Sequence, residues 1–124
     1  MIPWPHRSPL LDAIGGLEYD PAQPTRLGFR VEGAKLNRRG FLHGGAISSI
    51  ADVVLGYGLA TLTDPPTDLI TINLSCDYLG AAREGEWVDI TVSPTRLGRR
   101  LAAATAVFAT DRPIATVSGL FMPA

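Results

Sequence analysis

The segment from residue 41 to residue 63 constrains the fold more than any other part of this 124-residue chain. It is apolar or small almost throughout, and Asp52 is its only residue with a formal charge at neutral pH. Two glycines open the segment and Pro65-Pro66 follow it, so we expect one long helix over residues 44–62. The segment also contains His43 and several serine, threonine and glycine residues, which favours a buried helix over a membrane span.

After this helix the apolar residues recur at every second position, which is typical of half-buried strands. In the first strand the apolar and polar side chains are expected on opposite faces: Ile70, Ile72, Leu74, Cys76 and Tyr78 on one, Thr71, Asn73, Ser75 and Asp77 on the other. A hairpin turn at 83–86, a strand at 88–92, a turn at 96–99, a strand at 101–110 and a last strand at 114–122 follow. The pattern predicts a four-stranded meander.

One long apolar helix followed by four strands predicts an α+β fold in which an antiparallel sheet wraps around the helix. A helix that is apolar on nearly every face must be covered on nearly every face, and one sheet covers only part of it, which favours a dimer. Upstream, residues 1–25 are expected to form a leader with one short helix near 8–14, and a strand is expected at 26–31. We expect residues 1–124 to form a single domain.

Composition and charge restrict the possible partners. The formal net charge is −1, so nothing indicates binding to nucleic acid or to an anionic membrane. The N-terminal residues lack the apolar run of a secretory signal, and we therefore expect a cytoplasmic protein. Cys76 alternates with core residues, and no spacing of histidine, cysteine and carboxylate indicates a metal site. We expect neither a metal nor a cofactor.

Asp52 is the residue that most suggests chemistry. Burying a lone carboxylate costs several kcal/mol unless the group is paired, hydrogen-bonded or protonated. One interpretation is structural, since Ser48 and Ser49 lie one turn back and could satisfy it. The segment before the helix favours another, because Gly44 and Gly45 leave backbone N–H groups approachable at the positive end of a helix dipole. Acyl transfer requires such donors for its oxyanion.

Spacing then decides how these groups could meet. Asp52 follows Gly44 by eight residues, which is about 12 Å along one helix. A carbonyl held at the Gly44 amide is therefore out of reach of Asp52 in the same chain. Asn37 and His43 add side-chain donors near Gly44, although a simpler interpretation is that His43 only caps the helix. Two helices packed antiparallel about a two-fold axis would join the groups, which predicts a site shared by two subunits.

Asn37, Gly40, His43-Gly44-Gly45 and Asp52, followed by the apolar helix, resemble the hotdog-fold acyl-CoA thioesterases of the phenylacetate-pathway (PaaI-like) group. The resemblance covers roughly residues 26 to 122. Further matching motifs follow in the family's order, namely Leu69–Leu74, Asp77-Tyr78-Leu79, Ala82–Gly85 and Arg96–Arg99. The chain departs from the family at Gly80-Ala81, where an Arg-Pro pair is usual, and at Thr71, where serine is usual.

The resemblance implies a hotdog fold and hydrolysis of a small aryl-acyl or short- to medium-chain acyl-CoA. The Gly44 amide, assisted by Asn37, would polarise the thioester carbonyl, and His43 would shape the site. Asp52 from the partner subunit would act as general base on water or as nucleophile, and both roles remain open. Thr71 would help to position Asp52 or the water.

The resemblance also implies binding of the CoA phosphates by Arg96, Arg99 and Arg100, and a homodimer that pairs further into a tetramer. Two other functions fit the same residues. A hotdog hydratase or dehydratase would use His43 and Asp52 to move protons at carbon. A non-catalytic module would bind acyl-CoA without turnover.

Overall fold

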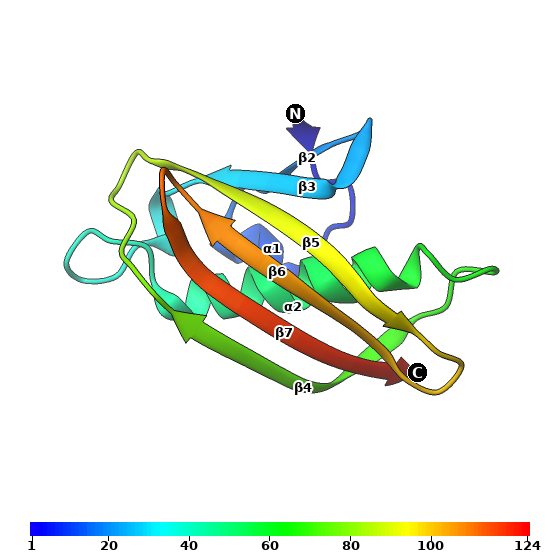
Figure 1. Cartoon of the computed structure of the whole chain (residues 1–124). Helices are drawn as coiled ribbons and strands as arrows, with labels where there is room; N and C mark the ends of the chain where they lie inside the picture. Colours follow the sequence, from blue (N-terminus) through cyan, green and yellow to red (C-terminus); the bar gives the residue numbers. More distant parts are fainter.

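The long helix α2 (Gly44–Ala60) lies against the concave side of a curved sheet, and the computed structural model describes all 124 residues (Figure 1). The remaining elements are β1 (Ile2–Pro3), α1 (Pro9–Ile14), β2 (Glu18–Asp20), β3 (Gln23–Arg30), a short 3-10 helix (Gly33–Lys35), β4 (Leu69–Tyr78), β5 (Trp87–Leu97), β6 (Ala102–Ala109) and β7 (Pro113–Pro123). All seven strands form one antiparallel sheet in the order β1-β2-β3-β5-β6-β7-β4. The predicted α+β hotdog architecture is confirmed.

Helix α2 forms the centre of the core. Its buried residues are Ala46, Ile47, Ile50, Ala51, Val54, Leu55 and Leu59. They pack in one cluster with Phe29, Ile90, Phe108 and Phe121 of the sheet. The helix ends at Ala60 rather than at the predicted residue 62. The hydroxyls of Thr61 and Thr63 donate to the carbonyls of Gly58 (3.0 Å) and Ala60 (2.8 Å), and so satisfy groups that a helix end leaves open.

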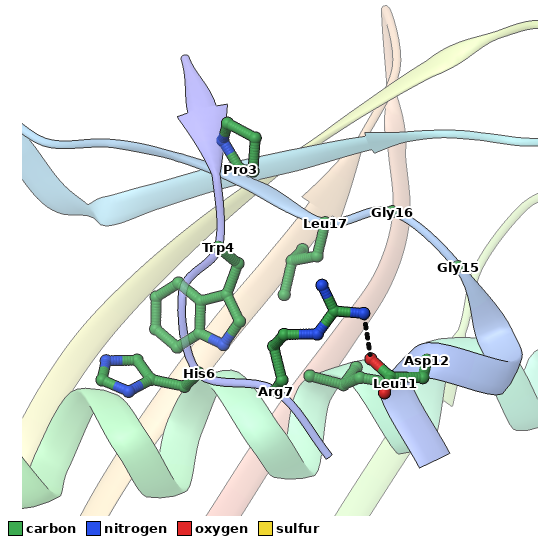
Figure 2. A pocket seen from close by; sticks show the side chains of 9 residues that line it. All are labelled: Pro3, Trp4, His6, Arg7, Leu11, Asp12, Gly15, Gly16 and Leu17. Carbon is green, nitrogen blue, oxygen red and sulfur yellow. Dashed lines mark ion pairs between the residues drawn. The ribbon is translucent and has the colours of Figure 1, made fainter. Parts of the chain in front are cut away.

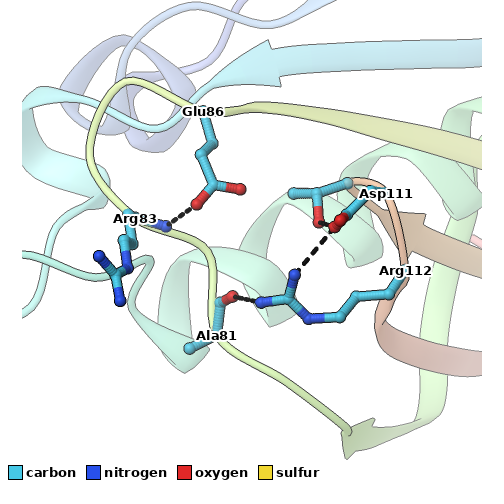
Figure 3. Close-up of polar contacts among 6 residues, drawn as sticks. Ala81, Arg83, Glu86, Asp111 and Arg112 are labelled. Carbon is cyan, nitrogen blue, oxygen red and sulfur yellow. Dashed lines mark hydrogen bonds and ion pairs between the residues drawn. The ribbon is translucent and has the colours of Figure 1, made fainter.

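The predicted four-stranded meander is wrong in its strand order. Strands β5, β6 and β7 form a meander, but β4 pairs with the far side of β7, and β5 pairs with β3. Residues 83–86 do form a turn, in which Gly85 has φ 91° and the Arg83 amide donates to Glu86 Oε1 (Figure 3). Local turn chemistry reports that the chain reverses, and it does not report which strands then pair.

The predicted faces of β4 are also wrong in its first half. Thr71 pairs with Phe121 and Asn73 with Leu120, so Ile72 has no partner and forms a β-bulge. The extra residue shifts the alternation by one position. Leu74 and Cys76 face the helix as predicted, but Ile70 and Ile72 point away from it and are 49% and 47% exposed. Thr71 shares the helix side of the sheet with its buried partner Phe121.

The N-terminal residues are more ordered than a leader with one helix. Helix α1 forms as predicted, and the Leu11 amide donates to the side chain of its cap Ser8. Strands β1 and β2 were not predicted, and β3 begins at Gln23, ahead of the predicted residue 26. These short strands extend the sheet beyond β3 and hold the segment around Trp4 against the core. None of the helices has the length and hydropathy needed to cross a bilayer.

Candidate active site

The Asp52 carboxylate lies in the middle of α2 and accepts a hydrogen bond from the Thr71 hydroxyl of β4 at 2.5 Å. The β4 bulge makes this contact possible, because it turns Thr71 toward the helix. The proposed serine partners do not serve Asp52: Ser48 donates to the Gly45 carbonyl instead, and Ser49 makes no side-chain hydrogen bond. A pocket of about 370 Å³ opens beside the carboxylate, and its wall includes Tyr57 and Phe121.

His43 caps the start of α2. Its backbone is extended (φ −72°, ψ 133°), and its Nδ1 accepts from the Gly45 amide at 2.7 Å. The amides of Ala46 and Ile47 donate to the His43 carbonyl. A neutral His43 that accepts through Nδ1 carries its proton on Nε2, which is left as a donor. The capping interpretation is therefore correct, and it leaves the second ring nitrogen available for a ligand.

The Gly44 amide is the one N–H group in this first turn that has no acceptor. It sits at the positive end of the helix dipole, where a developing negative charge is stabilised. Tyr78 lies across the same residue: its hydroxyl donates to the Gly44 carbonyl at 3.2 Å, and a Cβ at Gly44 would meet its ring at 3.3 Å. Desolvation, with the Cys76 thiol nearby, raises the pKa of Tyr78, so the phenol stays protonated as a donor.

Asn37 is fixed by its own loop. Its side-chain oxygen accepts from the amides of Arg39 (2.9 Å) and Phe41 (3.1 Å), and Gly40 completes the turn with φ 82°. With the oxygen engaged twice, the amide NH₂ of Asn37 is directed away from the loop and can donate. Asn37 and His43 line one open hollow together with Arg38 and Arg39. The structure therefore brings these two predicted donors to the same place.

The predicted residues thus form two groups in one chain. Asn37, His43 and Gly44 gather at the start of α2, whereas Asp52 and Thr71 face a pocket that includes none of these three. The two groups are separated by about 12 Å of helix. The helix over Gly44–Ala60 therefore keeps the two groups of one chain apart.

The three predicted CoA-binding arginines lie near the other end of α2. Arg96 belongs to β5, and Arg99 and Arg100 to the turn that follows it, on the side of the molecule where α2 ends (Figure 1). Arg99 lines a pocket of about 410 Å³ with Thr63 and Leu69, and Leu69 also lines the Asp52 pocket. The ion pairs of the structure are Arg7–Asp12, Arg26–Asp89 and Arg112–Asp111, so all three of these arginines are free to meet an anion.

Sequence reasoning assigned no role to Tyr78 or Tyr57. The order Asp77-Tyr78-Leu79 placed Tyr78 in a motif, but its contact with Gly44 depends on where β4 lies relative to α2. Tyr57 was hidden in the apolar helix, and only its position in the wall of the Asp52 pocket distinguishes it from a core residue. The structure contains no cluster of three or more histidine, cysteine or acidic side chains that could hold a metal ion.

Comparisons with known proteins show which proteins this chain resembles. A family model described as the thioesterase superfamily matches residues 39–112. A Pseudomonas aeruginosa protein named as a candidate esterase is 36% identical over 117 residues, which are 92% of this chain and 87% of that protein. The crystal structure of zebrafish thioesterase superfamily member 2 has a TM-score of 0.78 and 25% identity, covering 87% of this chain and 81% of that one. A Streptococcus pneumoniae hypothetical thioesterase, solved with coenzyme A, has a TM-score of 0.76 and 19% identity, covering 86% and 87% of the two chains.

Proposed function

Because the chain belongs to the thioesterase superfamily, we propose that it hydrolyses an acyl-CoA thioester in an active site shared by two subunits. The observation that carries the proposal is the divided site on one helix. A free amide suited to an oxyanion stands at Gly44, and a carboxylate held by a hydroxyl stands at Asp52, two helical turns further on. The acyl group is a small aryl or a short- to medium-chain group.

The thioester carbonyl would sit at the start of α2. Its oxygen would accept from the Gly44 amide, with the Asn37 NH₂ as a second donor, and both hydrogen bonds would strengthen as the oxygen becomes negative. Tyr78 would hold the Gly44 peptide in place through its carbonyl. These donors are already in position before the substrate arrives, so little reorganisation is needed during the reaction.

Asp52 would supply the second half of the reaction from the opposite subunit. As general base it would take a proton from water, the hydroxide would add to the carbonyl carbon, and the C–S bond would break to release CoA as the thiolate. As nucleophile it would attack the carbonyl carbon and break the C–S bond, which releases CoA as the thiolate and leaves an anhydride that water then opens. Either role uses the carboxylate oxygen that Thr71 leaves free.

A second copy of the chain would bring the two groups together. Strand β4 lies at one end of the sheet, so its outer backbone edge has no partner. The solvent side of α2 next to it carries small residues at Gly45 and Ser49, which let two helix backbones approach. Antiparallel packing there would place Gly44 opposite Asp52 of the partner subunit. Light scattering should give the mass of a dimer, or of a tetramer if dimers pair further.

The CoA moiety would extend from this site toward the free arginines. Arg96, Arg99 and Arg100 lie at the end of α2 that the Asp52 pocket approaches, and guanidinium groups bind phosphate well. The coenzyme A in the Streptococcus pneumoniae neighbour supports the same class of ligand for this chain.

The direct test is thiol release from a panel of acyl-CoA thioesters, followed with a thiol-reactive dye. Asp52→Asn should remain folded and lose about 100- to 10,000-fold in kcat. Asp68→Asn is the matched control, because Asp68 is the other carboxylate lining the same pocket, and it should retain near-normal turnover. Turnover by Asp52→Asn at the wild-type rate would refute the proposed chemistry.

A mixing experiment tests the shared site. Asp52→Asn and Gly44→Pro should each be inactive alone, because each homodimer lacks one half of every site. After unfolding and refolding an equal mixture, about half of the dimers are mixed, and each of these has one intact site. Activity should therefore return to about a quarter of the wild-type level. If the site lay within one chain, the mixture would stay inactive.

A further inference from the structure

Tyr57 lines the Asp52 pocket, and the next residue, Gly58, lines a second, more apolar cavity. This cavity has a volume of about 430 Å³, and the buried residues Leu27, Val54 and Val92 form its floor. Trp4 and His6 of the N-terminal segment form part of its roof. The cavity has the size and the apolar walls of a small-ligand site.

Residues of the sequence Gly56-Tyr57-Gly58 line two different cavities. Successive residues of a helix point about 100° apart, so Tyr57 projects between its two neighbours. Gly56 lines the Asp52 pocket and Gly58 lines the apolar cavity. Each glycine leaves open the space on its own side, and the one large side chain between them is the tyrosine. Tyr57 itself lines the Asp52 pocket.

The N-terminal segment holds the Tyr57 ring from the cavity side. The His6 imidazole stacks on it with a centroid distance of 4.8 Å and an interplanar angle of 14°. The Trp4 indole meets it edge-on at 6.2 Å and 79°. Figure 2 shows Trp4 and His6 on this segment, above the pale green ribbon of α2. The stacked rings therefore contact both spaces, because Tyr57 lines the Asp52 pocket and His6 lines the apolar cavity.

From these contacts we propose that Tyr57, braced by His6, is the wall that ends the acyl pocket and sets the length of the acyl group. The inference rests on the proposed thioesterase function. An acyl chain whose carbonyl lies beside Asp52 would meet Tyr57, which is five residues on, or about 7.5 Å along the axis, whereas CoA would leave past Leu69, which also lines the Arg99 pocket. The ring closes the way to the apolar cavity, so the natural substrates carry short or compact acyl groups.

Replacing the ring would join the two spaces. In Tyr57→Ala a longer aliphatic tail would pass between Gly56 and Gly58 and lie on Leu27, Val54 and Val92. Each methylene group buried is worth about a fourfold gain in binding. A gain of at least about tenfold in the ratio of kcat/KM for decanoyl-CoA to that for butanoyl-CoA is therefore expected. His6 is a positioning residue, and His6→Ala should raise the same ratio by a smaller factor.

The test compares kcat/KM from butanoyl-CoA to dodecanoyl-CoA in the full chain. Wild type and Tyr57→Phe should both lose activity between hexanoyl-CoA and decanoyl-CoA, because the ring and not its hydroxyl forms the wall. The double variant Tyr57→Ala/Gly58→Leu refills the cavity and should restore the wild-type ratio. A ratio is the useful readout, since a general loss of folded enzyme lowers both activities alike.

Binding of decanoate, measured by calorimetry, tests the role of Tyr57 as the end of the acyl pocket independently of thioester hydrolysis. Tyr57→Ala should bind decanoate at least tenfold more tightly than wild type, whether or not thioesters are hydrolysed. If no acyl-CoA releases thiol but this difference is found, the proposed function fails and the wall stands. If wild type hydrolyses decanoyl-CoA as readily as butanoyl-CoA, or if Tyr57→Ala changes neither the ratio nor decanoate binding, the inference is overturned.

Discussion

Gly44→Pro removes one hydrogen atom from the proposed oxyanion site while leaving the helix intact. Gly44 is the first residue of α2, and its N–H has no acceptor within the protein, so proline costs no hydrogen bond. Proline is favoured at this position of a helix. It also requires an extended residue before it, and His43 already has φ −72° and ψ 133°. The backbone is therefore suited to the substitution.

The expected effect is large on catalysis and small on stability. Loss of one oxyanion donor lowers kcat by about 100- to 1,000-fold, or about 2.7–4 kcal/mol. Fixing the unfolded backbone with proline adds about 0.4–1 kcal/mol to the free energy of unfolding. Contact with the Tyr78 ring, which lies 3.3 Å from a Cβ at residue 44, offsets part of that gain. The melting temperature should therefore change little.

Gly44→Ala is the matched control, because it places the same Cβ against Tyr78 and keeps the amide. Steady-state thiol release gives kcat and KM for all three proteins, and circular dichroism with light scattering confirms the fold and the mass. Alanine should lower kcat only severalfold. If the proline variant is folded, dimeric and within threefold of the alanine variant in kcat, the Gly44 amide is not the oxyanion donor.

Two further substitutions test the neighbouring contacts. Thr71→Val removes the hydroxyl that donates to Asp52 at 2.5 Å. It should lower kcat by about 10- to 100-fold, since a hydrogen bond to a charged group is worth about 1.5–3 kcal/mol. Thr71→Ser should keep a kcat near that of the wild type, and equal kcat values for the valine and serine variants would contradict the role of the hydroxyl. Lys35 is 1% exposed, and burial lowers its pKa below 10.5. Because the unfolded chain binds this proton more tightly, the free energy of unfolding of the wild type should increase as the pH rises from the lowered pKa to 10.5. Lys35→Met should raise the free energy of unfolding at pH 7 by about 1 kcal/mol and abolish that rise in denaturant titrations; a less stable variant would refute the argument.

Regular periodicity made much of the fold predictable. The apolar run after Gly44 and the alternation around residues 88–92 and 114–122 each correspond to an observed element. The order of the strands was not predictable in the same way. Strand β4 pairs with β7, more than thirty residues later, and that choice depends on how the sheet closes over α2. A local turn signal at residues 83–86 contains no information about it.

The β4 bulge is the clearest difference between the faces predicted from the sequence pattern and those observed in the structure. Alternation alone put Thr71 on the polar face, away from the helix. A single unpaired residue, Ile72, exchanges the two faces of the first half of the strand, so that Thr71 faces Asp52. Bulges arise from pairing with a neighbouring strand, in this case β7, so a sequence period of two cannot locate them.

The order of the residues alone places a glycine-rich start and a lone carboxylate on one apolar helix, eight residues apart. Because the rise of a helix is constant, that spacing predicts a second subunit for any chemistry that uses both groups. The packing of the other elements against α2 selects the side chains that contact these two groups. Tyr78 reaches α2 from β4, and His6 reaches it from the N-terminal segment. Thr71, which the family resemblance places beside Asp52, reaches it through the β4 bulge. Contacts of this kind depend on packing in three dimensions, which no local pattern encodes.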